Sequence, residues 1–120
     1  MTDTANSSLD ELDDQWIRVC EQRELAPGER RVVEGPDIDI LVVNADGVIL
    51  AVVDECSHQE LPISDGPLNG DIITCPWHGA DFCLHDGEAL SAPAYEPIDC
   101  YDIRVENDII YVASTPREAG

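Results

Sequence analysis

Two short units in the sequence bring together residue types that bind metals. The first is Cys56-Ser57-His58, and the second, Cys75-Pro76-Trp77-His78, begins after 16 intervening residues. Each unit supplies one soft thiolate and one imidazole, a donor set that suits zinc and iron–sulfur clusters. The residue types therefore predict a metal centre held by Cys56, His58, Cys75 and His78, and they leave open which metal it contains.

Zinc is one candidate for this centre. Structural zinc modules usually pair their cysteines in one short unit and their histidines in another. Here each unit mixes one cysteine with one histidine, which is not the zinc pattern. A zinc-stabilised interaction module without redox activity is nevertheless one alternative. A chance grouping of free cysteines and surface histidines is the other.

The order and spacing of the two units resemble those of the Rieske iron–sulfur family. In that family two cysteines bind one iron of a [2Fe–2S] cluster and two histidines bind the other. The resemblance implies one such cluster, with Cys56 and Cys75 on one iron and His58 and His78 on the second. Other residues of the two loops also match the family: Gly66, Pro76, Trp77 and Gly79.

Four positions differ from the high-potential Rieske proteins of respiratory complexes. Those proteins carry an extra cysteine in each loop and join the two by a disulfide, whereas this sequence has Leu61 and Trp77 there. They also carry a serine and a tyrosine that donate hydrogen bonds to sulfur, whereas this sequence has Ala80 and Phe82. Because such bonds stabilise the more negative reduced cluster, their absence predicts a reduction potential of about −150 mV.

The pattern is similar to the Rieske-type ferredoxins of bacterial aromatic ring-hydroxylating dioxygenase systems, which act on substrates such as biphenyl, naphthalene, toluene or carbazole. This resemblance implies a one-electron carrier between a ferredoxin reductase and a terminal oxygenase, and not an enzyme. A Rieske-type small subunit of an NAD(P)H nitrite reductase is the alternative within the same fold. The chain has three histidines, so His85 alone is left for a mononuclear iron site, which needs two histidines and a carboxylate.

The charge of the chain limits its partners. It has 26 acidic and 6 basic residues, a net charge of −20. Such a charge repels nucleic acids and anionic membranes, and no apolar run is long enough to span a membrane. The charge favours transient docking to a cationic protein surface, or serves only solubility in a salt-tolerant host. Four acidic residues flank the loops, and they either bind a cationic partner or form an acidic surface that contacts only water: Asp54, Glu55, Glu60 and Asp65.

Apolar runs of strand length predict an all-β domain, and the resemblance implies a Rieske-like fold of small antiparallel sheets. Residues 44–47 and 106–108 carry hairpin-turn signals. Residues 54–93 are rich in glycine, proline, cysteine and histidine, and we expect them to form a loop-rich cluster-binding part that a metal would make rigid. The predicted strands are 15–20, 30–34, 38–43, 48–53, 71–74, 80–84, 101–105 and 109–113.

The length of 120 residues suits one domain. Residues 1–14 are polar and acidic, so we expect a flexible tail followed by a single Rieske domain over 15–120. The sequence does not begin with a basic stretch followed by an apolar one, the pattern of an export signal, so we expect a cytoplasmic protein. We also expect the protein to be a monomer. Five cysteines argue against a disulfide framework. The residues outside the ligand pattern are expected to be free, packed thiols at Cys20, Cys83 and Cys100, and an exposed turn residue at His85.

Overall fold

The computed structural model describes residues 16–36, 38–57, 61–77, 79–92 and 96–117. Within these ranges the chain forms ten β-strands in three antiparallel sheets and a single 3-10 turn, which confirms the all-β prediction. No helix in this part of the chain has the length and apolar character needed to cross a membrane. The predicted tail, 1–14, and the predicted ligands His58 and His78 lie outside the described residues.

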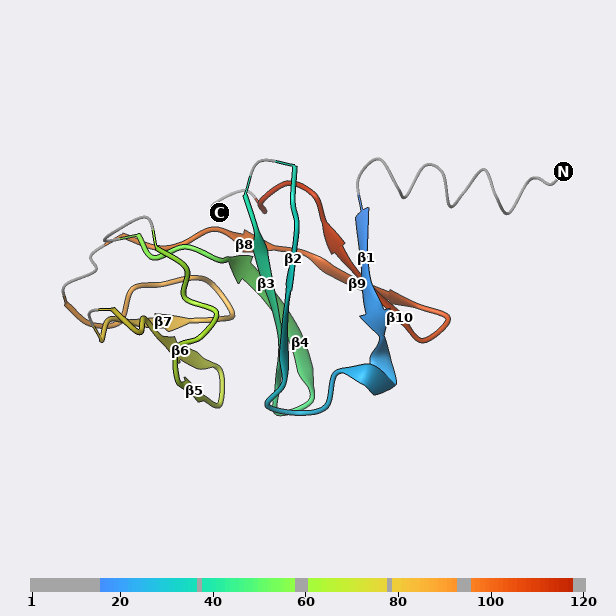
Figure 1. Ribbon diagram of the computed structural model, residues 1–120, viewed down its shortest axis with the longest axis horizontal. Coiled ribbons are helices and arrows are strands. Elements are labelled where there is room, and N and C mark those ends of the chain that lie inside the picture. The colour runs from blue at the N-terminus through green and yellow to red at the C-terminus, as the bar shows by residue number, and fades with distance from the viewer. Residues whose placement is uncertain (1–15, 37, 58–60, 78, 93–95, 118–120) are drawn as a thin grey trace, which may run out of the picture.

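A four-stranded sheet in the middle of the molecule supplies much of the core (Figure 1). All six residues of β3 are buried, as the continuous apolar run predicted. Strand β4 is buried only from Ala51 onward, and Val48 at its start is exposed. The strand order is β2 (Arg30–Val33), β3 (Ile40–Ala45), β4 (Val48–Val53) and β8 (Cys100–Tyr101).

The hairpin between β3 and β4 closes through a turn of two residues, Asp46 and Gly47. Their φ angles are 54° and 100°, the left-handed conformation that two-residue hairpin turns require. Strand β3 therefore runs to Ala45, further than predicted, and Asn44 belongs to the strand. The Asn44 side chain still supports the turn, because its Oδ1 accepts a hydrogen bond of 2.7 Å from the Gly47 amide.

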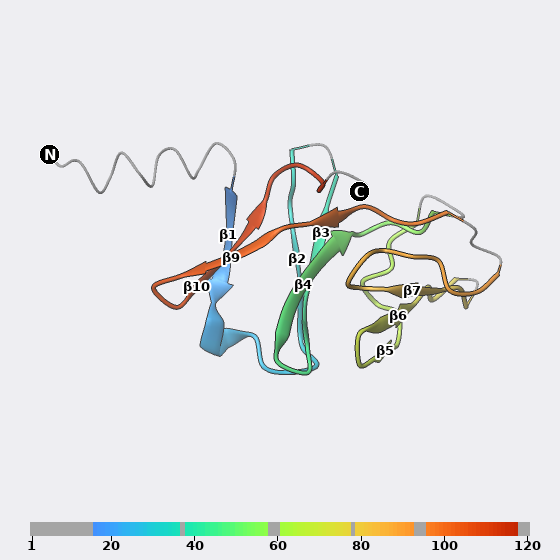
Figure 2. The same ribbon diagram turned by 180° about the vertical axis from the view of Figure 1, so that it is seen from behind.

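Two smaller sheets lie at opposite ends of the central sheet (Figures 1 and 2). The predicted strand 101–105 is divided between β8 and β9, so one segment of chain serves two sheets. The 3-10 turn η1 (Gln22–Glu24) and strand β5 were not predicted, because neither segment contains an apolar run in the sequence. One sheet contains β1 (Trp16–Glu21), β10 (Ile109–Ala113) and β9 (Ile103–Glu106); the other contains β5 (Leu68–Asn69), β6 (Ile72–Thr74) and β7 (Asp81–Cys83).

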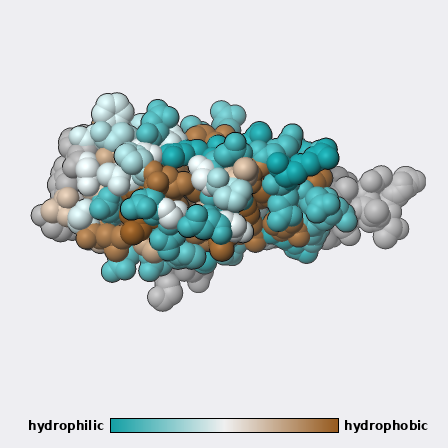
Figure 3. Space-filling model, turned by 90° about the horizontal axis from the view of Figure 1, so that it is seen from below, coloured by the Kyte–Doolittle hydropathy of each residue, from teal (hydrophilic) through white to brown (hydrophobic). Residues whose placement is uncertain are grey.

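The part of the hydrophobic core that lies in the sheet β5–β6–β7 and the loops beside it is small. Its side chains are almost completely buried: Ile63, Ile73, Ala80, Phe82 and Leu84. The face of the molecule seen in Figure 3, in contrast, carries separate apolar areas among hydrophilic ones. Two loops with the predicted cysteines are attached to this small core, residues 54–67 after β4 and residues 75–80 between β6 and β7.

Candidate metal centre

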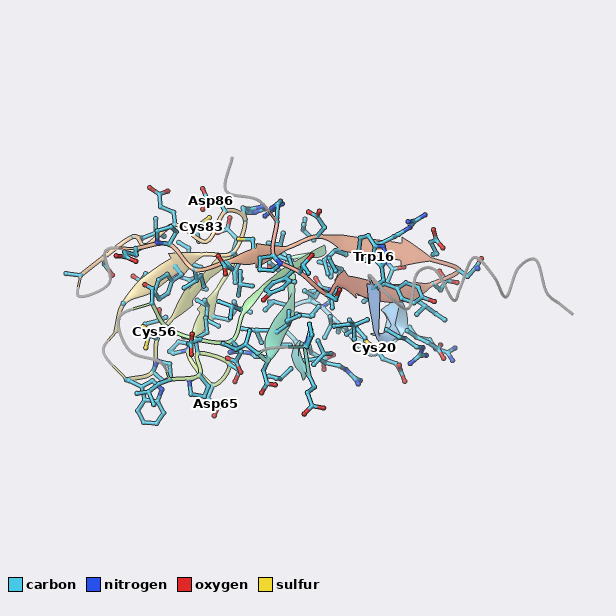
Figure 4. The ribbon with its side chains drawn as sticks, turned by 90° about the horizontal axis from the view of Figure 1, so that it is seen from above. Trp16, Cys20, Cys56, Asp65, Cys83 and Asp86 are labelled. Atoms are coloured by element: carbon cyan, nitrogen blue, oxygen red, sulfur yellow. The ribbon has the colours of Figure 1, made fainter. Side chains whose placement is uncertain are left out.

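The two predicted cysteine ligands are buried at the end of the molecule that carries β5–β7. Cys56 and Cys75 each expose 1% of their surface, and neither forms a disulfide. Figure 4 shows Cys56 at this end, remote from Cys20 at the other. Buried thiols that are not joined in a disulfide fit the role of thiolate ligands, and in a [2Fe–2S] cluster they would bind one iron.

Each of these cysteines stands at the base of a loop that closes on itself. The amide of Cys56 donates to the carbonyl of Leu61 at 2.9 Å, and the amide of Cys75 donates to the carbonyl of Ala80 at 2.7 Å. In the sequence each closed loop contains one of the predicted histidines. The second loop turns back at Gly79, whose φ of 76° favours glycine. Two closed loops with one cysteine and one histidine each are a donor arrangement that fits a mixed-ligand cluster.

A tryptophan connects the two loops. The indole Nε1 of Trp77, in the second loop, donates a hydrogen bond of 3.0 Å to the carbonyl of Pro62 in the first. The high-potential proteins described above have a disulfide at the positions of Leu61 and Trp77. Here a hydrogen bond next to Leu61 joins the loops instead. The indole stays 56% exposed, so it links the loops at the surface and is not part of the core.

The first loop also approaches strand β6 closely at Gly66. A Cβ atom added to Gly66 would lie 1.8 Å from the carbonyl oxygen of Thr74, the residue before Cys75. Only glycine permits this contact, since a Cβ atom essentially never comes within 3.0 Å of a heavy atom of a residue distant in the chain. Gly66 thereby brings the end of the first loop against the strand that leads to Cys75.

The residues that replace the donors of the high-potential proteins are both enclosed. Ala80 and Phe82 are completely buried, and neither side chain can donate a hydrogen bond. The low reduction potential expected from the missing side-chain donors stays a prediction.

The remaining candidate residues take structural positions. Cys20 and Cys100 are buried free thiols, as predicted, and Cys83 is half-buried. Cys83 and Asp86 lie together on an edge away from Cys56 (Figure 4). His85 is an exposed turn residue, as predicted, and its Nε2 lies 3.1 Å from the carboxylate of Asp71.

The acidic residues beside the loops do not all belong to a surface rim. Asp54 is only 8% exposed, and its Oδ1 accepts hydrogen bonds from the amides of Ile63 at 2.9 Å and Ser64 at 2.8 Å. The docking role considered for Asp54 is therefore wrong, because its carboxylate is buried and accepts hydrogen bonds from two backbone amides of the loop. Asp65 is exposed, and Glu60 lies outside the described residues.

The buried thiols predict a pH dependence of stability. Burial raises the pKa of Cys20 and of Cys100 above the ordinary value of 9.0. The unfolded chain therefore loses these protons at lower pH than the folded chain does, so their contribution is complete below about pH 9 and declines as the pH rises. We expect the free energy of unfolding to fall above about pH 9, by at most about 1.4 kcal/mol per pH unit for each thiol.

Urea unfolding at a series of pH values measures this slope. The variant Cys20→Ala retains Cys100 and should show a shallower decline than the unsubstituted chain. Equal slopes in the two proteins above about pH 9 would show that Cys20 does not contribute.

The chain is similar to known proteins over most of its length. The model of the family "Rieske [2Fe-2S] domain" matches residues 15–102. The biphenyl 2,3-dioxygenase ferredoxin component of Rhodococcus jostii (strain RHA1) is 38% identical over 96 residues, which cover 79% of this chain and 89% of that protein. The 3-phenylpropionate/cinnamic acid dioxygenase ferredoxin subunit of Photorhabdus laumondii is 41% identical over 95 residues, 78% of this chain and 90% of that protein.

A solved structure extends this similarity to the fold. It is the complex of reduced oxygenase and oxidized ferredoxin in carbazole 1,9a-dioxygenase. One of its chains superposes on this one with a TM-score of 0.83 and 30% identity, over 86% of this chain and 96% of that chain.

Proposed function

This chain belongs to the Rieske [2Fe–2S] domain family, and on that basis we propose that it holds one [2Fe–2S] cluster through Cys56, His58, Cys75 and His78. The burial of both thiols and the closed loop around each cysteine support the assignment. When bound, such a cluster supplies a one-electron redox couple. The cluster-binding part is the loop-rich segment 54–93, within a single domain that spans 15–120.

The function we propose is one-electron transfer from a ferredoxin reductase to the terminal oxygenase of an aromatic ring-hydroxylating dioxygenase. The observation that carries this proposal is the similarity to ferredoxin components over nearly their whole length. The chain's own residues agree with a carrier that is not a catalyst. Three histidines, two of them assigned to the cluster, are too few for a separate mononuclear iron site.

The roles of the chain's residues follow from their positions. Cys56 and Cys75 are buried, so their sulfurs would be kept away from water, which limits reorganisation of solvent when charge changes. The exposed indole of Trp77 lies next to His78 in the sequence and gives the partner an apolar contact. We place the docking surface for both redox partners at this end of the molecule.

The partners, oligomeric state and location complete the proposal. A net charge of −20 favours cationic docking surfaces on the reductase and the oxygenase, with transient complexes. None of the five cysteines forms a disulfide, which supports a reducing compartment, the cytoplasm. We propose that the carrier is a monomer, so that the cluster end stays accessible to each partner in turn.

The proposed function is tested by replacing a ferredoxin in a reconstituted system. The reductase and oxygenase components of a biphenyl dioxygenase and of a carbazole 1,9a-dioxygenase are each mixed with NADH, the aromatic substrate and this chain. We expect oxygen consumption that depends on both the substrate and the chain. Failure of the chain to take up electrons from NADH through either reductase would contradict the proposal.

The residue after Gly79 should influence the reduction potential. The variant Ala80→Ser would place a hydroxyl where the high-potential proteins have a hydrogen-bond donor. We expect the potential to rise by about 60 mV, because about 1.4 kcal/mol of preferential stabilisation of the reduced form equals about 59 mV for one electron. Redox titration followed by absorption measures the change.

The control for this prediction is Ala89→Ser, which adds the same hydroxyl at a half-buried position outside the cysteine loops. It should leave the potential unchanged. Equal potentials in Ala80→Ser and Ala89→Ser would show that position 80 does not reach the sulfurs.

A further inference from the structure

One tight turn, residues 63–66, lies within the first cysteine loop and connects it with the second loop and with the strand before that loop. The amide of Gly66 donates to the carbonyl of Ile63 at 2.9 Å and closes this turn, which we call the bridging turn. On one side the preceding residue, Pro62, accepts the hydrogen bond from Trp77. On the other side Gly66 packs against Thr74. A displacement of the bridging turn would therefore change how the two loops lie relative to each other.

An arginine from the central sheet binds the bridging turn. The guanidinium of Arg30, on β2, donates from one nitrogen to the carbonyl of Ser64 at 2.8 Å and to that of Gly66 at 2.6 Å. The Arg30 side chain is half-buried. Hydrogen bonds from a charged donor are roughly twice as strong as those between neutral groups. In a chain with 26 acidic residues, this cation is used to hold two backbone carbonyls.

A buried carboxylate binds the same turn through its amides. The Oδ1 of Asp54 accepts hydrogen bonds from Ile63 and Ser64. Its own amide donates to the carbonyl of Asp39 at 3.0 Å, so Asp54 is fixed to the chain just before β3. Asp54 also stands two positions before Cys56 in the sequence. The carboxylate thus connects the bridging turn with the start of the first cysteine loop.

The side chains of Arg30 and Asp54 both bind the backbone of Ser64. The amide of Ser64 is held by Asp54 and the carbonyl of Ser64 is held by Arg30. Rotation of this segment would break a charge-assisted hydrogen bond and leave a partly buried charge without its partner, which is costly. The bridging turn is consequently held in one orientation from two places in the fold, β2 and the end of β4.

We propose that Arg30 and Asp54 are positioning residues, which clamp the bridging turn and so hold the two cysteine loops at the spacing that the cluster needs. This inference rests on the cluster assignment made above. It adds two residues that lie outside the ligand set and act through the bridging turn. Loops held in place before an electron arrives need little rearrangement when the charge of the site changes.

The test compares two arginines of the same strand. Arg30→Gln removes the clamp, and Arg31→Gln removes the same charge from an exposed neighbour. Arg30→Lys keeps the charge and a donor. Hydrogen exchange of the full purified chain is followed by mass spectrometry in peptides covering 61–67, with 103–112 as an internal reference. The release of iron to a chelator and the electron paramagnetic resonance (EPR) spectrum are recorded for the same samples.

We expect Arg30→Gln to exchange at least tenfold faster in 61–67, to release iron at least tenfold faster and to give broader EPR lines. Arg31→Gln should match the unsubstituted chain, and Arg30→Lys should lie between Arg30→Gln and that chain. Equal exchange in Arg30→Gln and Arg31→Gln would overturn the proposal. Faster exchange in 103–112 as well would also overturn it, because the residue would then act on the whole fold.

Two further results keep the inference testable. If Arg30→Gln does not fold, Asp54→Asn, which keeps the size of the side chain and removes its charge, must accelerate exchange in 61–67 alone. If the unsubstituted chain shows no [2Fe–2S] signal, the proposed function fails, while the exchange comparison still decides the clamp. If the unsubstituted chain shows a normal [2Fe–2S] signal and neither Arg30→Gln nor Asp54→Asn changes hydrogen exchange in 61–67, the clamp is contradicted. The proposed function then still stands.

Discussion

Substitution of Cys75 by serine is expected to abolish the Rieske-type EPR signal of the reduced protein. Cys75 is buried at the base of the second loop, where a thiolate would bind one iron. A serine hydroxyl is a harder and far less acidic ligand, and metal affinity depends on a deprotonated donor. We therefore expect loss of the whole signal and of most bound iron, which EPR and iron analysis of the purified variant would measure.

Cys83→Ser is the matched control for this prediction. Cys83 is a free, half-buried thiol on β7, in the same small sheet, and it lies outside the predicted ligand set. The control should keep its iron and an unchanged spectrum. If Cys75→Ser retained the spectrum and the reduction potential of the unsubstituted chain, the ligand assignment would be wrong.

Substitution of Gly66 by alanine is expected to prevent the two cysteine loops from closing. The added Cβ would lie 1.8 Å from the carbonyl oxygen of Thr74 and 2.9 Å from its carbonyl carbon. Both are backbone atoms, so relief requires movement of the strand that leads to Cys75. We expect a loss of about 3 kcal/mol in the free energy of unfolding, the upper range for overpacking, together with loss of the cluster. Urea unfolding and iron content measure the two effects.

Gly70→Ala separates this steric effect from the general cost of replacing a glycine. Gly70 has a φ of 64° in the turn between β5 and β6, and an added Cβ would approach only Asp46 Oδ2, at 3.7 Å. Its left-handed conformation costs about 1 kcal/mol with alanine, and the iron content should not change. Equal iron content in Gly66→Ala and Gly70→Ala would mean that the close approach at Gly66 is not needed.

Much of the fold could be predicted because its strands carry strong local signals. The apolar runs that became β3 and β4, and the turn at Asp46-Gly47, show both the period and the turn residues of a buried hairpin. The break at Asp102 between β8 and β9 left no such signal. It arises because the segment pairs first with β4 and then with β10, and such a choice between sheets depends on tertiary packing.

The cysteine and histidine pattern predicted the family and the metal centre, but not the residues that hold the loops in place. Asp54 was considered only as one member of an acidic rim, and Arg30 only as part of a strand. Their contacts join positions 34 and 36 residues apart for Arg30 and about ten apart for Asp54. Such long-range pairs have no sequence period. Gly66 was recognised through the family pattern, but the reason for it, the close approach to Thr74, required the structure.

The central claim, a [2Fe–2S] cluster with two cysteine and two histidine ligands, is tested most directly by EPR. Spectra of the purified chain are recorded as isolated and after reduction with dithionite. The account predicts silence in the oxidised sample and, on reduction, a rhombic signal with a low average g value, which mixed ligation produces. Silence in both samples, with zinc found by metal analysis, would contradict it and leave a zinc-stabilised module as the better description.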